Sequence, residues 1–210
     1  SYTFENVIIK GDIQFTKYDE NNILMPGAEF TIYDSLNNPV TTSTSSGSGV
    51  VLFADIPYGV YTIKETDAPI SYALSQVVLD ASIVDEGVTV DAQPNTLANA
   101  LKAGDIRVLK FDEGSNPLQD ATFTLYDSGD NPISSETTNS SGIALFTDIT
   151  YGDYYVVETD APTGYVLSST RYDVSITTDG QTVEVQAGGI INDPIMGSIS
   201  FSKQNPGGDG

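Results

Sequence analysis

Three polar residues whose side chains could react with one another lie on apolar faces of expected strands. In the segment GDIQFTK a strand period of two puts Lys17 on the same face as an isoleucine and a phenylalanine. The same period places Glu65 with the apolar residues of YTIKE, and Asn99 between two leucines. An amine and a carboxamide can condense to an amide with loss of ammonia, and a carboxyl group between them can carry the proton.

Each of these residues, taken alone, also has an ordinary explanation. An inward lysine can protect an edge strand, a single glutamate can be solvated, and an asparagine near a strand end is commonly a turn residue. The three recur together 93 residues later, as Lys110, Glu158 and Asn192. Burying an unpaired ammonium or carboxylate costs several kcal/mol, so recurrence on apolar faces favours groups that satisfy one another.

The whole chain repeats with this offset. The run ETDAP at 65–69 returns unchanged at 158–162, and no gap is needed over the full overlap. The repeat predicts two domains, at 11–103 and 104–196. Residues 1–10 are expected to end a preceding repeat or form a linker, and 197–210 to begin a following repeat or form a linker. Asn6 and Lys203 continue the two series, and we expect them to remain unlinked within this chain.

The elements that carry these residues are expected to be short strands. Turn signals rich in Gly, Pro, Asn and Asp recur at the short intervals typical of all-β domains, and the segments between them are rich in Val, Ile, Thr, Tyr and Phe. No segment keeps a helical apolar period. The pattern predicts an all-β protein in which each module is a sandwich of about seven strands.

Composition excludes several classes of function. A net charge of −21 with eight Lys and Arg argues against nucleic acid or an anionic membrane as partner. Cys and His are absent, which removes disulfides, thiol nucleophiles and His-based catalysis. No apolar run is long enough to span a membrane, and no signal peptide is expected in SYTFENVIIK. No cofactor is predicted, and Asp127, Asp130 and Asn131 suggest an ordinary acidic turn more than a calcium site.

Several motifs together resemble the collagen-adhesin B-type (Cna B-type) domains of Gram-positive surface adhesins and pilins. They are the opening strand GDIxxxK, the segment GAEFTIYD at 27–34, and YxxxETDAPxxY at 61–72 and 154–165, which is similar to the pilin E-box. The resemblance covers both modules. It implies two tandem immunoglobulin-like (prealbumin-like, reverse-Ig) β-sandwich domains.

The resemblance also implies a role for each site residue. A lysine of the first strand would join an asparagine of the last strand, with the glutamate as catalyst. The implied sets are Lys17, Glu65 and Asn99 in the first module, and Lys110, Glu158 and Asn192 in the second. Two features leave questions open. Asn95 has the strand parity of Asn99, although the repeat favours Asn99, and Ser71 replaces the glycine that stands at Gly164.

The expected function is a structural stalk on a bacterial cell surface, anchored to the cell wall through regions outside this chain. Its expected partners are neighbouring repeats of the same polypeptide, and host protein or glycan only through a distal domain. Alternatives are a ligand-binding adhesin domain, which a binding screen would reveal, and a pilin shaft subunit, although no LPxTG sortase signal occurs here. A turnover enzyme is not expected, because crosslinking would happen once per molecule.

Overall fold

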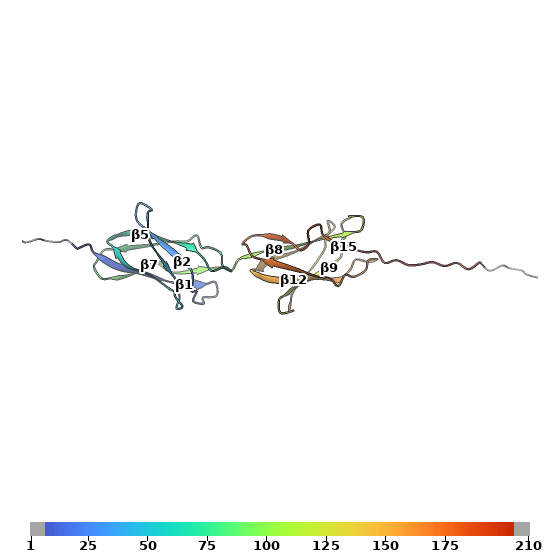
Figure 1. Ribbon diagram of the computed structural model, residues 1–210, viewed down its shortest axis with the longest axis horizontal. Helices are drawn as coiled ribbons and strands as arrows, with labels where there is room; N and C mark the ends of the chain where they lie inside the picture. The colour runs from blue at the N-terminus through green and yellow to red at the C-terminus, as the bar shows by residue number, and fades with distance from the viewer. Residues whose placement is uncertain (1–6, 204–210) are drawn as a thin grey trace, which may run out of the picture. The chain divides into compact units, whose positions relative to one another are not determined.

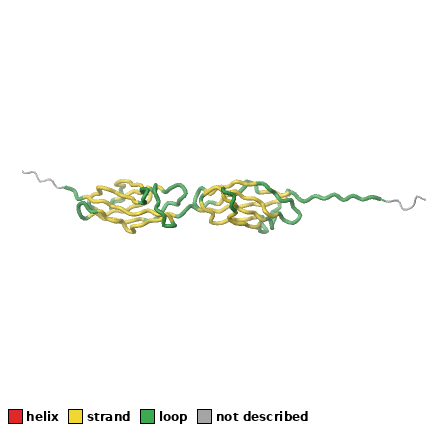
Figure 2. Tube along the Cα trace, turned by 90° about the horizontal axis from the view of Figure 1, so that it is seen from below, coloured by secondary structure: helices red, strands yellow, loops and turns green. Residues whose placement is uncertain are grey.

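The computed structural model describes residues 7–203, which form β-strands and loops without any helix in that range (Figures 1 and 2). The first module holds β1 (Lys10–Asp19), β2 (Glu29–Tyr33), β3 (Pro39–Thr44), β4 (Val50–Pro57), β5 (Gly59–Asp67), β6 (Val78–Ile83) and β7 (Thr89–Asn99). The second holds β8 (Ala103–Asp112), β9 (Thr122–Asp127), β10 (Pro132–Thr137), β11 (Ile143–Thr150), β12 (Gly152–Asp160), β13 (Arg171–Ile176), β14 (Thr182–Glu184) and β15 (Ile190–Asn192).

The first module is a sandwich whose strands follow the order β3-β2-β5-β6-β7-β1-β4. A single residue pair, Asp80 with Gln93, joins β6 to β7, so the strands before and after this point form two layers. The layers meet through an edge-to-face contact between Phe15 and Phe30, whose ring centroids lie 4.8 Å apart. The predicted seven strands are confirmed in this module.

The second module repeats the arrangement with one interruption. Its layers have the orders β10-β9-β12-β13 and β11-β8-β14, and β15 also pairs with β8. The counterpart of β7 is therefore split into β14 and β15. Between them Gly188 and Gly189 take positive φ values of 87° and 82°, which a continuous strand cannot accommodate.

The alternation predicted from sequence is confirmed along β1, where every second residue from Gly11 to Asp19 is buried. β12 breaks the simple alternation, because the adjacent residues Tyr155 and Val156 are both buried. The ring of Tyr155 is 8% exposed, stacked on Tyr126 with the Arg171 guanidinium 3.6 Å from its centroid. A cation and a second ring thus bury an aromatic residue on the outer face of the sheet.

The glycine that opens each module is required by a close approach of two chain segments. A Cβ on Gly11 would lie 2.7 Å from the carbonyl oxygen of Val88, and one on Gly104 would lie 2.5 Å from that of Gln181. Both distances are too short for any larger residue. This contact lets the first strand run closely beside the start of the last.

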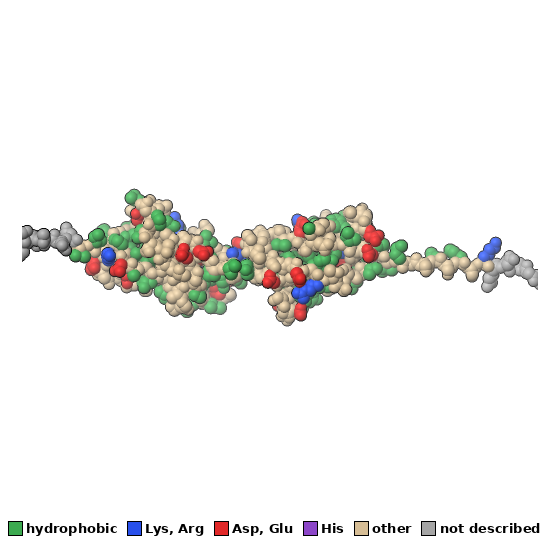
Figure 3. Space-filling view, in the orientation of Figure 1, with side chains coloured by type: hydrophobic (Ala, Val, Ile, Leu, Met, Phe, Trp, Pro, Cys, Tyr) green, Lys and Arg blue, Asp and Glu red, His purple; other side chains and the backbone are tan. Residues whose placement is uncertain are grey.

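The chain folds as two compact units whose main boundary lies at Gly104–Asp105. No helix long and apolar enough to cross a membrane occurs in the part of the chain that the structure describes. Acidic side chains are spread over the visible face of both modules, with few cations among them (Figure 3). Asn6 lies outside the described residues, and Lys203 is exposed.

Candidate crosslink site

The lysine and asparagine of each set lie on neighbouring parallel strands. In the first module β1 pairs with β7 so that Lys17 stands opposite Leu97 and Asp19 opposite Asn99. Lys17 and Asn99 are thus offset by two residues, which puts them on one face of the sheet. Diagonal neighbours of this kind are separated by roughly 7–8 Å at the backbone, within reach of a lysine side chain. In the second module β8 and β15 pair Lys110 with Ile190 in the same register.

The glutamate approaches from the other layer and holds the asparagine. Glu65 lies on β5, and its Oε1 and Oε2 accept hydrogen bonds of 2.7 and 2.9 Å from Nδ2 of Asn99. In the second module Nδ2 of Asn192 donates to Oε1 of Glu158 at 2.7 Å. The structure therefore brings the predicted carboxyl and carboxamide groups into direct contact in both modules.

All six predicted site residues are buried. Both lysines have no exposed surface, and Glu65, Asn99, Glu158 and Asn192 are each at most 5% exposed. Burial removes water from the groups that would exchange protons, which strengthens every electrostatic interaction among them. In the first module this burial favours neutral forms of the amine and the carboxyl group over an ion pair.

Backbone carbonyl groups orient the lysine amines. Nζ of Lys17 donates to the carbonyl oxygens of Tyr18 at 2.9 Å and Leu97 at 3.5 Å. Nζ of Lys110 donates to those of Phe111 and Ile190, at 3.3 and 3.1 Å. A neutral amine has two hydrogens and one lone pair. When both hydrogens are bound to carbonyls, the lone pair points in the remaining direction and is available for attack.

Burial also shifts the titration of these groups in opposite directions. It lowers the pKa of Lys17, although the charges of Glu65 and Asp19 act to raise it. Burial lowers the pKa of Lys110 in the same way. The pKa of Glu65 is raised by burial, and the N–H of Ser75 opposes this shift. The first module thus moves its lysine and glutamate toward the neutral pair that nucleophilic attack requires.

The orientation of each asparagine amide suits loss of its nitrogen. Nδ2, which would leave as ammonia, contacts the glutamate, whose carboxyl group can carry a proton to it. Oδ1 of Asn99 and Oδ1 of Asn192 are buried without a hydrogen-bond partner among the described residues. The side-chain carbonyl is therefore not held by any of these residues in the resting arrangement.

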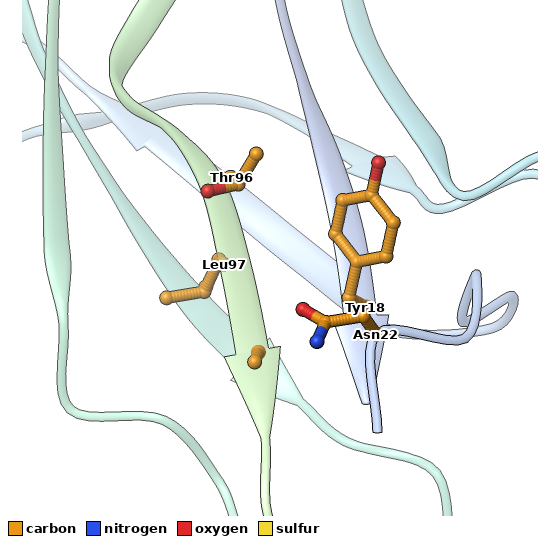
Figure 4. Close-up of a pocket in the computed structure, with 5 residues that line it drawn as sticks. Tyr18, Asn22, Thr96 and Leu97 are labelled. Atoms are coloured by element: carbon orange, nitrogen blue, oxygen red, sulfur yellow. The ribbon is translucent and has the colours of Figure 1, made fainter. Parts of the chain in front are cut away.

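Asn95, the alternative partner for Lys17, is exposed. The pairing of β1 with β7 passes from Gln14–Asp91 to Thr16–Thr96, so β7 advances five residues where β1 advances two. The extra residues lift Asn95 away from the core. Figure 4 shows this strand pair at a pocket of about 310 Å³, with Tyr18, Asn22 and Thr96 among the residues that line it. The crosslink residues do not line it.

The loop that follows β5 contains contacts that sequence reasoning missed. The backbone N–H of Ser75 donates to Oε2 of Glu65 at 2.7 Å, and that of Ser168 donates to Oε2 of Glu158 at 2.9 Å. A serine at both repeat positions was the only available signal. Backbone donors carry no residue-type signature, so their role could not be found from residue types alone.

The question left open at Ser71 is answered by a change of turn type. In both modules the tyrosine N–H bonds back to a proline carbonyl, from Tyr72 to Pro69 and from Tyr165 to Pro162. Gly164 has φ +91°, as the third residue of a type II turn requires, whereas Ser71 is not among the residues with positive φ. The first module thus closes the same hydrogen bond without a left-handed residue.

The acidic turn considered for calcium is occupied by its own hydrogen bonds. Oδ1 of Asp127 accepts the N–H groups of Gly129 and Asn131, and both carboxylate oxygens contact Nδ2 of Asn131. In residues 7–203 no three His, Cys, Asp or Glu side chains are grouped to hold a metal ion. The turn is a hydrogen-bonded Asx structure.

Comparison with known proteins agrees with this architecture. The SpaA prealbumin-like fold domain family matches residues 11–96 and 104–190. The chain belongs to this family. The predicted family resemblance and the prealbumin-like fold are thereby confirmed.

Individual relatives share its domains over part of their length. The Bacillus anthracis TIE protein is 30% identical with a TM-score of 0.70, over 88% of this chain and 34% of that structure. The trypsin-resistant surface T6 protein of Streptococcus pyogenes serotype M6 is 35% identical over 71 residues, which are 34% of this chain and 13% of that protein. The C-terminal fragment of the pilus adhesin SpaC from Lactobacillus rhamnosus GG shares the fold, with a TM-score of 0.52 and 18% identity. The match covers 91% of this chain and 100% of that structure. The two modules are similar to domains of Gram-positive surface proteins and pilins, and the chain spans about a third or less of the first two relatives.

Proposed function

We propose that each module closes a covalent isopeptide bond, Lys17 to Asn99 in the first and Lys110 to Asn192 in the second. The observation that carries this proposal is the buried glutamate–asparagine hydrogen bond beside a fully buried lysine, present in both modules. Two copies of a costly buried arrangement are hard to explain as packing alone.

The reaction in the first module begins with transfer of a proton from the Lys17 ammonium to the Glu65 carboxylate. Nζ then attacks Cγ of Asn99, forming the new C–N bond and a tetrahedral centre. Glu65 passes its proton to Nδ2 and accepts one from Nζ. The C–Nδ2 bond breaks, ammonia leaves, and the net change is the loss of one ammonia molecule with no oxidant or cofactor. Because the product is permanent, the chain modifies itself once and does not turn over a substrate.

The crosslink gives the module a mechanical role. Lys17 lies near the end of the first strand and Asn99 at the end of the last, so tension entering β1 would pass through the bond and leave beyond β7. Strands β2 to β6 would then carry no load. A spacer whose modules cannot be pulled open is suited to a surface stalk, and membership of a family that includes domains of surface proteins supports this role.

We place the chain outside the cell, on the surface of a Gram-positive bacterium, anchored through regions beyond this chain. Its direct partners are the neighbouring repeats of the same polypeptide. Contact with a host protein or glycan would belong to a distal domain.

Intact-mass measurement of the folded protein tests the proposal. The expected mass is that of the plain sequence less two ammonia molecules, and proteolysis should yield branched peptides that join 17 to 99 and 110 to 192. Lys17→Arg should abolish the first branch and retain the second. A wild-type mass equal to the plain sequence would overturn the proposal.

A further inference from the structure

The loop after the glutamate strand supplies the same backbone donor in both modules. Ser75 and Ser168 each lie ten residues after their glutamate, and each N–H donates to Oε2, at 2.7 and 2.9 Å. The other oxygen, Oε1, lies 2.7 Å from the asparagine Nδ2 in both modules, and in the first module Oε2 also accepts from Nδ2, at 2.9 Å. Only Oε2 receives a backbone N–H. The two carboxyl oxygens are therefore in different environments.

This difference matters when the carboxyl group is protonated. A protonated carboxyl carries its hydrogen on one oxygen and leaves the other as an acceptor. Oε2 of Glu65 receives N–H groups from both Ser75 and Asn99, whereas Oε1 receives one, so Oε2 is the better supported acceptor and the hydrogen is favoured on Oε1. Oε1 is also the oxygen nearer to the nitrogen that must leave, at 2.7 Å.

Resting on the crosslinking reaction proposed above, we infer that the backbone N–H groups of Ser75 and Ser168 are positioning groups that direct the acid proton to Oε1. They contact the catalytic carboxyl but not the reacting carbon or nitrogen. Their effect is to set which oxygen acts as acid, and to hold the carboxyl plane facing the amide.

The serine side chain stabilises this arrangement. Oγ of Ser75 accepts the N–H of Val77 at 3.2 Å, and Oγ of Ser168 accepts that of Thr170 at 3.3 Å. Such a serine turn fixes the direction of the preceding N–H. A shallow depression of 280 Å³ lined by Glu65, Leu74 and Ser75 lies beside this loop. The backbone N–H of Ala73 also donates to the carbonyl oxygen of Ala100 at 2.9 Å, so the loop keeps a second hold on its path when the serine hydroxyl is removed.

The N–H of Ser75 also changes the pKa of Glu65, and the direction of that change distinguishes a positioning role from an effect on acidity. It lowers the pKa of Glu65 against the effect of burial, so its removal leaves that pKa higher. A higher pKa would make the neutral pair more populated, not less. A slower reaction after removal of the N–H would therefore have to come from lost orientation.

The experiment follows crosslinking in newly synthesised full-length chain, measured as ammonia loss by mass spectrometry and assigned to each module by its branched peptide. Ser75 is replaced by proline, by alanine, and by the matching α-hydroxy acid, which exchanges only the N–H for an ester oxygen. The proline and ester variants should crosslink the first module about tenfold more slowly or worse, a partial loss of the roughly 10²–10⁴-fold contribution of a general acid. Ser75→Ala keeps the N–H and should remain within a few-fold of wild type. The second module reports in every sample as an internal control.

The pH profile supplies a readout that a merely structural role would not move. The ester variant should move the high-pH limb of the crosslinking rate to higher pH, because the carboxyl then holds its proton longer. If wild type crosslinks both modules and the ester variant matches it in rate and pH limb, the positioning role is overturned. If wild type loses no ammonia at all, the crosslinking proposal itself has failed. Should the proline variant not fold, the ester variant alone decides.

Discussion

The side-chain Nδ2 of Asn99 donates hydrogen bonds to both carboxylate oxygens of Glu65, at 2.7 and 2.9 Å. The bond joins two strands from opposite layers inside the core. It places a proton carrier on the atom that would depart as ammonia, and it is repeated by Asn192 and Glu158 at 2.7 Å.

Replacing Glu65 with glutamine should stop the first crosslink. Glutamine keeps the shape and a carbonyl acceptor but cannot carry a proton between Nζ and Nδ2. The intact mass of Glu65→Gln should fall short of the plain sequence by one ammonia, and Glu158→Gln should behave in the same way. A double variant that still loses ammonia would contradict the assigned role.

Asn99→Ala should abolish the first crosslink, and Asn95→Ala should leave it intact. Asn95 is exposed and lies beyond the irregular pairing of β7, whereas Asn99 is buried on Glu65. Peptide mapping after proteolysis distinguishes the two variants. If Asn95→Ala lost the branched peptide and Asn99→Ala retained it, Asn95 and not Asn99 would be the partner of Lys17.

Loss of the crosslink should lower stability by an amount set mainly by the unfolded chain. A bond from Lys17 to Asn99 closes a loop of about 80 residues, for which loop entropy gives about 4.5 kcal/mol. Lys17→Met removes the amine but keeps an apolar stem, and the free energy of unfolding in denaturant should fall by roughly this amount. Lys10→Met, at an exposed lysine on the same strand, is the matched control and should change little. Equal stability of the two variants would argue against a covalent link.

The two versions of the proline turn should differ in how much an alanine substitution destabilises them. Gly164→Ala forces a side chain into a residue with φ +91° and should cost about 1–2 kcal/mol. Ser71→Ala occupies a turn position without positive φ, and its effect should stay within about 0.5 kcal/mol. Thermal unfolding of the two variants beside wild type measures both effects. A neutral Gly164→Ala would show that the second turn can convert to the first type.

The Asx turn at Asp127 predicts a specific acid titration. The backbone N–H and the side-chain amide of Asn131 lower the pKa of Asp127. Because the folded value lies below the unfolded one, the associated stability is complete above the usual aspartate range and is lost as pH falls through the lowered pKa. Carboxyl NMR titration should show this directly, and Asn131→Ala should raise the pKa of Asp127. Asp34, which forms the same turn with Asn38, serves as the unmodified reference within the chain.

Much of the fold followed from periods in the sequence. The two-residue period of GDIQFTK correctly placed Lys17 inside, and the 93-residue repeat chose Asn99 over the exposed Asn95. These features can be predicted because side chains along a strand alternate strictly between its two faces. A repeat also shows each position twice, so a residue type that recurs is distinguished from a chance occurrence.

Other features depend on backbone geometry that residue types do not encode. The N–H of Ser75 reaches Glu65 only because an irregular loop folds back over it, and no pattern of side chains specifies that path. The interruption between β14 and β15 arises at Gly188 and Gly189, which could equally have marked an ordinary turn. The burial of Tyr155 is not encoded in the alternation of its own strand, because its cover comes from Arg171 on a different strand.

The parallel pairing of β1 with β7 has a consequence for a module that has not yet reacted. Chain ends pulled in opposite directions along two parallel neighbours slide past one another, so the ladder of hydrogen bonds between them is strained in shear, all at once, instead of opening one bond at a time. A module that has not yet reacted would therefore resist extension through many hydrogen bonds at once, and this resistance would keep Lys17 and Asn99 in register against a pulling force while the slower chemistry is completed.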